Sequence, residues 1–240
     1  MQVNNDFYHD LGDRWHLATD HPIALLRAEN RLRSPWIANL LPSPSKVLDM
    51  GCGAGFLAHD LAKLGHEVVG IDLSEQSLAI AKKIDTTKKI QYLQADVTKT
   101  PFETASFDAI FAMDLLEHLE DPAALIREAS RLLKPGGFFF FHTFNRTFLS
   151  WLIVVKGVEW CIKNTPPQLH VHRLFIKPFD LRRICDDQGL KVQVMKWMNI
   201  KAKSRPFFKM LITREVPEDL EFVFSNSLAV GYCGYCQKVK

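Results

Sequence analysis

The sequence has few cysteines, no strong excess of charge and no apolar run long enough to cross a membrane. Its 30 basic and 27 acidic residues leave a formal net charge of +3 over 240 residues. This excess is compatible with an anionic surface or ligand but too small to indicate nucleic acid, for which no recognition motif is present. The most apolar segment, within 148–163, is a mostly apolar stretch of about 15 residues, whereas a bilayer span takes about 20. Without repeats or low-complexity tracts, residues 1–240 are expected to form a single domain.

Cysteine usage points to a reducing compartment. The five cysteines are an odd number, and the polar, acidic start MQVNNDFYHD does not resemble a signal or transit peptide. We therefore expect free thiols and a cytoplasmic location. Cys233 and Cys236 form a CxxC pair without a second pair. Because residues three apart in a strand point to opposite faces, this pair is not expected to bind zinc or to act as a redox site.

Short apolar runs alternate with helical segments from residue 46 onward. Before that, residues 1–45 carry apolar residues at near-helical spacing and end in a break rich in proline and serine, which predicts an N-terminal helical segment. Strands are predicted at 46–50, 67–73, 90–96, 106–113, 138–144, 191–200 and about 228–236, and helices at 56–65, 74–84, 121–133 and 179–190. This alternation is typical of βαβ units, so we predict an α/β fold whose parallel sheet is covered by helices on both faces.

The alternation stops at Asn145 and resumes at Phe179. The intervening segment, residues 145–178, is more apolar and ends in a proline-bounded loop rich in histidine. We predict that this segment is an insertion over the open end of the sheet.

The stretch VLDMGCGAG, residues 47–55, runs from a predicted strand into a glycine-rich turn that opens a helix. Its glycines allow close approach of a ligand and present amide groups at a helix N-terminus. Asp72 ends the next strand, where a carboxylate can accept hydrogen bonds from both ribose hydroxyls. These features also fit a dinucleotide-dependent dehydrogenase. Two others argue against it: the pattern is DxGxGxG, beginning at Asp49, and a second acid, Asp96, ends the third strand, where it could accept from an adenine amine.

Together with RLLKPGGFFFF, these motifs resemble the class I S-adenosylmethionine-dependent methyltransferases over about residues 46–143. The resemblance implies a Rossmann-like sheet of seven mostly parallel strands, in the order 3-2-1-4-5-7-6 with strand seven antiparallel. It implies S-adenosylmethionine as cofactor, with Gly51 and Gly53 at its methionine and ribose, and Met113 on its sulfonium side. Asp96 and Val97 would lie at the adenine. The implied binding residues are Asp49, Gly51, Gly53, Asp72, Leu73, Asp96, Val97 and Met113.

Further stretches resemble one family more closely, the ubiquinone-biosynthesis O-methyltransferases, which methylate polyprenylated catechol-type rings. These stretches are MDLLEHLEDP, KPGGFFFFHTFNRTFLSWL, VKGVEW, HVHRLFIKPFDL, GLKV and, upstream, NRLRSPWI. The last of them would place Arg33 near the cofactor's carboxylate. The first 30 residues or so and the last 40 match the family poorly, and Asp114 stands where the family usually has Glu.

This resemblance implies O-methylation of a phenolic hydroxyl on a polyprenylated ring in ubiquinone biosynthesis. The partners would be a polyprenylated phenol or quinol, an anionic membrane surface and other enzymes of the pathway. Two alternatives stay open: an O-methyltransferase for another small phenol or natural product, and a catalytically inactive accessory protein that only binds the cofactor.

Asp114, Glu117 and His118 follow the predicted fourth strand directly. If a helix begins there, their spacing places the three side chains on one face. The resemblance associates these positions with a divalent cation, which would bind the acceptor's oxygens and lower the pKa of its phenol. Alternatively, His118 is a general base without a metal, or the Glu117–His118 pair is structural. The three residues are the expected catalytic set and a candidate metal site.

The predicted insertion has two interpretations, a lid over the sheet or an interfacial element on the inner face of the membrane. As a helix, residues 148–163 would gather Lys156, Glu159 and Lys163 on one side and leave a wide apolar remainder. Lys163 would assist binding to anionic lipid, and so would two later cations. Those later cations are Arg173 and Lys177.

Three histidines are the candidates for lining an acceptor pocket, namely His142, His170 and His172.

Overall fold

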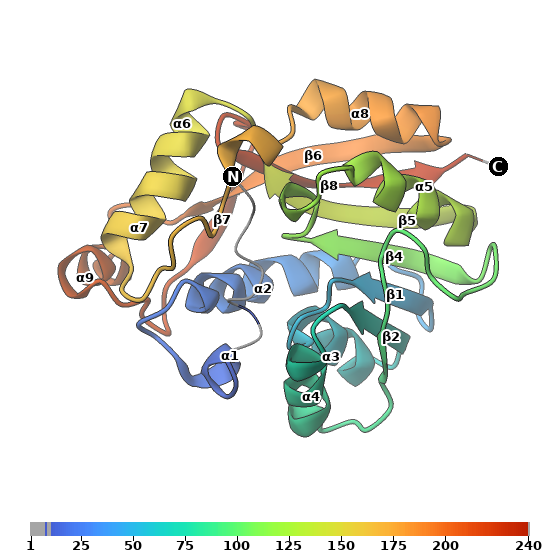
Figure 1. The fold of residues 1–240 in the computed structure, drawn as a ribbon, viewed down its shortest axis with the longest axis horizontal. Coiled ribbons are helices and arrows are strands. Elements are labelled where there is room, and N and C mark those ends of the chain that lie inside the picture. Colours follow the sequence, from blue (N-terminus) through green and yellow to red (C-terminus); the bar gives the residue numbers. More distant parts are fainter. Residues whose placement is uncertain (1–7, 9–10, 240) are drawn as a thin grey trace.

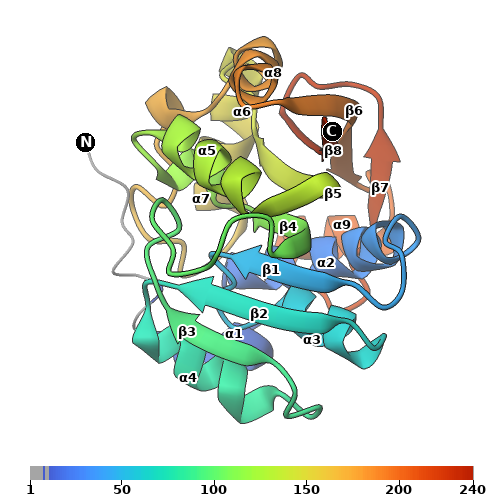
Figure 2. The ribbon, with the colours of Figure 1, turned by 90° about the vertical axis from the view of Figure 1, so that its right-hand side faces the viewer.

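The computed structural model describes residue 8 and residues 11–239, which form a single twisted sheet with helices on both faces (Figures 1 and 2). The sheet order is β3-β2-β1-β4-β5-β8-β6-β7. Strands β1 to β5 are mutually parallel, and β8 is antiparallel to both β5 and β6. The strands are β1 (Lys46–Met50), β2 (Glu67–Asp72), β3 (Gln91–Gln94), β4 (Phe107–Met113), β5 (Leu133–Phe144), β6 (Leu190–Ile200), β7 (Phe222–Ser225) and β8 (Gly231–Lys238).

The α/β class and the predicted strand order are confirmed, with one correction. The described residues contain eight strands rather than seven, because β7 pairs antiparallel with the far end of β6. Figure 2 shows β3 and β7 at opposite edges of the sheet. A four-residue edge strand has too few alternating positions to stand out in the sequence. β5 also begins earlier than predicted, at Leu133. Its pairing with β4 changes register between Phe107 and Ala109 of β4.

The helices begin where local capping predicts. The Ser74 hydroxyl accepts a hydrogen bond from the Ser77 amide at 3.1 Å, and Asp121 caps the helix that starts at Pro122. The helices are α1 (Arg14–Leu17), α2 (Ile23–Ala38), α3 (Phe56–Lys63), α4 (Glu75–Ile84), α5 (Pro122–Leu132), α6 (Phe148–Ser150), α7 (Val158–Cys161), α8 (Pro178–Asp187) and α9 (Arg205–Thr213). A π-helical stretch, Trp151–Gly157, joins α6 to α7.

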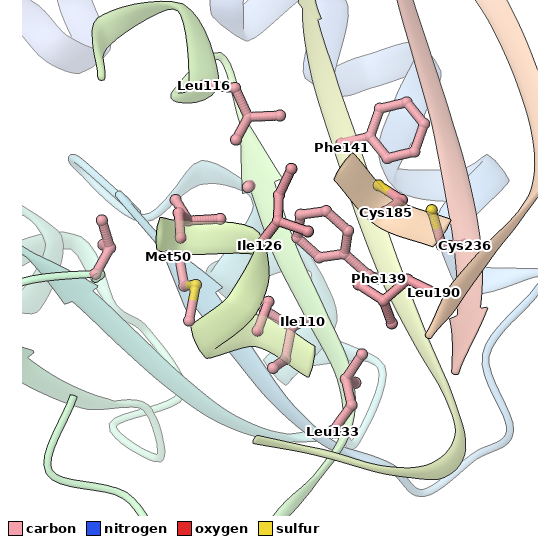
Figure 3. Close-up of a cluster of buried hydrophobic side chains, with 14 of the residues drawn as sticks. Met50, Ile110, Leu116, Ile126, Leu133, Phe139, Phe141, Cys185, Leu190 and Cys236 are labelled. Atoms are coloured by element: carbon pink, nitrogen blue, oxygen red, sulfur yellow. The ribbon is translucent and has the colours of Figure 1, made fainter. Parts of the chain in front are cut away.

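The phenylalanine run of β5 places side chains in the cores on both faces of the sheet. Phe139 and Phe141 pack beneath α5 and α8 in the core of Figure 3, whereas Phe140 packs on the opposite face with α2 and α3. The two cysteines of the CxxC pair separate in the same way. Cys236 lies in the core of Figure 3, Cys233 lies in the core beneath α9, and all five cysteines are free thiols. The predicted opposite orientation of the pair is confirmed.

A third core joins the C-terminal part of the chain to segment 145–178. Ile162, at the end of α7, packs with Met210 of α9 and Phe222 of β7. Figure 1 shows α7 and α9 next to each other at one end of the molecule. The predicted pattern contains neither α9 nor β7, although together they complete this end of the fold.

Candidate active site

The glycine-rich turn after β1 forms one wall of a cavity of about 200 Å³ at the carboxyl ends of the strands. Gly51 and Gly53 have backbone φ angles of +68° and +51°, a region that favours glycine. A Cβ atom would also lie 2.9 Å from the Leu115 side chain at Gly51, and 2.9 Å from Trp15 at Gly53. Both positions therefore require glycine for backbone conformation and for space.

Asp72 closes this turn from the neighbouring strand. Its carboxylate accepts hydrogen bonds from the Gly53 amide at 2.9 Å and from the Ser74 amide at 2.8 Å. Each carboxylate oxygen can accept more than one hydrogen bond, so the group can still bind hydroxyls of a ligand in the cavity. Asp72 thus positions the turn and faces the cavity.

Most of the predicted cofactor residues line this cavity. They are Arg33, Asp49, Gly51, Gly53, Asp72, Leu73, Val97 and Met113. Asp96 is outside the set of lining residues that the structure describes; it is exposed, and its Oδ1 accepts from the Thr98 amide at 2.8 Å. Sequence reasoning missed Tyr8 and Trp15, whose stacked rings, 5.8 Å apart, also line the cavity. No local pattern marks these two residues, because the fold brings the N-terminal segment to the turn.

Asp49 is a buried carboxyl at the end of β1. Burial raises its pKa to about 7, Arg33 opposes this shift, and the negative charge of Asp72 adds to it. A cationic group of a ligand placed beside Asp49 would favour its ionised form. The cavity therefore contains two acids: Asp72, which holds the turn, and Asp49, whose ionised form a positively charged ligand would favour.

Asp114 is held by two basic side chains at the mouth of β4. Arg33 Nη1 lies 2.5 Å from one of its carboxylate oxygens, and His142 Nδ1 is hydrogen-bonded to the other. Burial opposes ionisation of Asp114, but the charges and hydrogen bonds of His142 and Arg33 outweigh it and hold the pKa of Asp114 well below its usual range. Arg33 lines the first cavity while it is ion-paired, so Asp114 fixes the position of this guanidinium.

The structure does not bring Asp114, Glu117 and His118 together on one helical face. Asp114 has a left-handed φ of +55°, a short 3₁₀ turn follows at Leu116–His118, and α5 starts only at Pro122. These breaks remove the 3.6-residue periodicity on which the expected helix depends. Asp114 instead groups with Glu29 and His142.

Glu117 and His118 group with His170, from the loop that follows α7. One ligand atom of each residue lies within 4.8 Å of those of the other two. Glu117 Oε1 and His118 Nδ1 are buried and have no hydrogen-bond partner within the described part of the chain. The other oxygen of Glu117 accepts from the Thr143 hydroxyl at 2.9 Å. The three side chains offer one carboxylate oxygen and two imidazole nitrogens as metal ligands, a combination that suits a divalent cation.

Burial controls the protonation of this group. It lowers the pKa of His118 to about 4 and that of His170 to about 3, so both imidazoles are neutral at pH 7. Burial, with the nearby negative charge of Asp114, raises the pKa of Glu117 to about 8. A neutral His118 can accept a proton, whereas a protonated Glu117 cannot.

A second cavity of about 380 Å³ lies on the far side of Asp114 and His118. Four residues line both cavities, namely Tyr8, Leu26, Asp114 and His118. The second cavity is mostly apolar, and its wall includes Ile153, Val158 and Phe207. It extends from the polar group at His118 to segment 145–178 and α9. A ligand in the first cavity and a ligand in the second would therefore meet beside His118.

Of the three histidines that the sequence suggests for an acceptor pocket, only His170 lines this cavity in the described residues. His142 is fully buried, pairs with Asp114 and stacks on Trp197 with ring centroids 5.5 Å apart. His172 Nε2 lies 2.8 Å from the Thr147 carbonyl oxygen and anchors the loop.

Sequence reasoning missed Glu29, a buried acid on the wall of the second cavity. The sequence signal that could have indicated Glu29 is its position four residues before Arg33 on α2, which places the two side chains next to each other.

The cations suggested for lipid contact are partly engaged with acids. Lys163 pairs with Glu215 at 2.7 Å, and Arg173 pairs with Glu120. Lys177 is exposed. Within the described ranges, no helix has the length and apolar character that a membrane span requires.

Comparison with known proteins gives consistent matches. Residues 48–141 match a family model described as a methyltransferase domain. A ubiquinone biosynthesis O-methyltransferase of Thiobacillus denitrificans is 36% identical over 182 residues, covering 74% of this chain and 78% of its own. Another, from Xanthomonas axonopodis pv. citri, is 36% identical over 201 residues, with 82% and 84% covered.

Solved structures show the same fold. A Thermotoga maritima methyltransferase, described as a possible histamine N-methyltransferase, has a TM-score of 0.62 at 19% identity and covers 94% of this chain and 93% of its own. The magnesium protoporphyrin IX methyltransferase of Synechocystis, solved with bound SAH, has a TM-score of 0.59 at 18% identity, with 88% and 83% covered.

Proposed function

The chain belongs to the ubiquinone biosynthesis O-methyltransferases, which are S-adenosylmethionine-dependent enzymes, and we propose that it methylates a phenolic hydroxyl on a polyprenylated ring. One observation carries the proposal. A cavity with a glycine turn and two acids meets a larger apolar cavity at Asp114 and His118. The first suits a charged, nucleoside-based cofactor, and the second suits a ring with an apolar tail.

Within the first cavity, Asp72 is assigned to the ribose and Asp49 to a positively charged part of the cofactor. Val97 and Met113 supply apolar walls. Asp96 is assigned to the adenine amine at the open edge, a role that its exposed position allows. S-adenosylmethionine supplies an activated methyl group with a good leaving group, so the protein's main task is to align the acceptor oxygen.

His118 is assigned as the base that accepts the phenol's proton. A free phenol has a pKa near 10, so little phenolate exists at pH 7. His118 is neutral there, borders both cavities and has an unpartnered Nδ1 within the described chain. His170 lies against it, with ring centroids 6.0 Å apart, and fixes its orientation by packing.

A divalent cation is the alternative means of activating the phenol. Glu117, His118 and His170 would hold it, and it would lower the pKa of the acceptor hydroxyl. Asp114 is not in this set, because its carboxylate is turned toward Arg33 and His142. This set replaces the triad that the sequence suggests.

We assign segment 145–178 as a lid that also faces the membrane. It supplies Ile153, Val154 and Val158 to the second cavity, hereafter the acceptor cavity, and it exposes five large apolar side chains, Ile153 among them. Those exposed side chains are Phe148, Leu149, Leu152, Ile153 and Trp160. The enzyme would then be cytoplasmic and peripheral on the inner face of the membrane, where a lipid-tailed substrate and other pathway enzymes are found.

The proposal is tested by methyl transfer to a short-chain demethyl-quinol with S-adenosylmethionine, with and without EDTA. We expect an O-methylated product. Activity that survives EDTA supports proton removal by His118 without a metal, and activity that EDTA abolishes and Mg²⁺ restores supports a cation that lowers the pKa of the phenol. Preferential turnover of a soluble catechol would favour a small-phenol methyltransferase instead. Cofactor binding without any transfer would indicate an inactive accessory protein.

A further inference from the structure

Helix α9 exposes apolar side chains on the face that points away from the core. Phe208 and Ile212 are 51% and 83% exposed, and Leu211 between them is also exposed. Their spacing of three and four residues places them on one face. Phe207 and Met210 point the other way, into the core shared with α7 and β7. The inward face accounts for the position of the helix, but not for the large apolar groups on its outward face.

Basic residues surround this apolar face. Residues 201–214, KAKSRPFFKMLITR, contain five basic and no acidic side chains. Arg205 and Lys209 are exposed and lie beside Phe208 and Ile212 at helical spacing. Long basic side chains at the border of an apolar face can extend their charges to a lipid headgroup layer while their stems cover apolar surface.

Acidic groups near the helix neutralise one of the five cations, Lys201, but no ion pair to Arg205 or Lys209 is found among the described residues. They lie in the segment that follows α9, and two of them are already paired: Glu215 with Lys163 at 2.7 Å and Glu221 with Lys201 at 2.6 Å. Glu218 and Asp219 are exposed in that segment, beyond the helix. The outward face of α9 itself therefore carries only positive charge.

The helix lies beside segment 145–178 and over the acceptor cavity. The Lys163 amide donates to the Arg214 carbonyl at 2.9 Å, which joins the end of α7 to the end of α9. On α7, Trp160 is 62% exposed, and the two helices are neighbours in Figure 1. Phe207 of α9 also lines the acceptor cavity. One face of α9 thus borders the cavity while the opposite face is apolar and basic.

We propose that α9 is a membrane-docking helix that inserts Phe208, Leu211 and Ile212 into the headgroup layer of an anionic lipid surface. The inference rests on the proposed function only in taking the acceptor to be lipid-tailed. An apolar face bordered by cations matches an anionic bilayer, where each basic residue near the surface strengthens binding by about fivefold and apolar burial adds to it. Docking here would bring the lipid against the wall of the acceptor cavity.

The test is flotation of the full chain with vesicles of phosphatidylcholine containing phosphatidylglycerol, and with phosphatidylcholine alone. We expect binding that depends on the anionic lipid. The variant Phe208→Ser/Ile212→Ser should weaken it by at least about tenfold, and Arg205→Glu/Lys209→Glu at least as much. Leu64→Ser and Lys99→Glu are matched controls, since Leu64 is 54% exposed beyond α3 and Lys99 is exposed after β3; both should bind as the wild type.

Each outcome separates this inference from the proposed function. Wild-type protein that does not float with anionic vesicles overturns the docking role, and so do α9 variants that bind like the controls. A third outcome is that the wild type self-associates but does not bind vesicles, and that the α9 variants lose the self-association. That result would assign the face to a second copy of the chain and overturn the lipid assignment. All variants should methylate a short-chain demethyl-quinol in solution at the wild-type rate; failure of the wild type in that assay would overturn the proposed function while leaving the flotation result intact.

Discussion

Replacing Asp114 by Asn removes one charge from a buried cluster and leaves the backbone unchanged. Asn tolerates the left-handed φ of +55° found at this position, so the substitution isolates the charge. In the variant, the buried Arg33 guanidinium, 2.5 Å from Asp114 in the wild type, loses its ionic partner. Breaking a buried ion pair on one side costs about 3–5 kcal/mol of unfolding free energy. For a chain of this size, that loss lowers Tm by roughly 6–20 °C.

The assay is chemical denaturation at pH 7, with Asp108→Asn as the matched control. Asp108 also pairs with a cation, Lys134 at 2.7 Å, but both side chains are more than one third exposed. The control should therefore lose no more than about 1 kcal/mol. The double variant Arg33→Met/Asp114→Asn should lose less than the sum of its single variants, because no guanidinium is left unpaired. An Asp114→Asn loss as small as the control's would refute the assignment of a buried, ionised pair.

Three further variants test the site. Gly53→Ala should weaken S-adenosylmethionine binding in calorimetry by at least about tenfold, because a Cβ would strain the positive φ and meet Trp15 at 2.9 Å. His118→Gln should lower kcat about 100-fold or more while cofactor affinity is kept. In EDTA, the contribution of Glu117 to stability, measured as the difference between the wild type and Glu117→Gln, should decline as pH rises from about 5 through 8, because the folded pKa of Glu117 is raised to about 8 and folding favours its protonated form.

The predictions that hold rest on local chemistry. The strand, glycine turn and helix from Lys46 to Lys63 lie in one continuous stretch, and Asp72 ends the neighbouring strand at the same edge of the sheet. Parallel strands of a βαβ unit bring their carboxyl ends together, so spacing along the sequence predicts a common edge. The alternation of apolar runs predicts the parallel α/β sheet, whereas the order of the strands is what the resemblance to class I methyltransferases implies.

The predictions that fail depend on contacts between distant parts of the chain. The spacing of Asp114, Glu117 and His118 suggests one face, but the left-handed residue at position 114 redirects the first side chain to Arg33, 81 residues earlier. His170 completes the other group from a loop that periodicity cannot place. Helix α9 lies outside the predicted pattern; its apolar residues face the core at Phe207 and Met210 and the surface at Phe208 and Ile212.

The most direct measurement is transfer of a labelled methyl group from S-adenosylmethionine to a short-chain demethyl-quinol, with the product's methylated atom identified by mass spectrometry and NMR. We predict a methyl group on the phenolic oxygen, with the rate lowered about 100-fold or more in His118→Gln. Cofactor binding by the wild type without any O-methylated product would contradict the proposed activity. A product methylated at carbon would contradict the assignment of the two cavities to a cofactor and a phenolic oxygen.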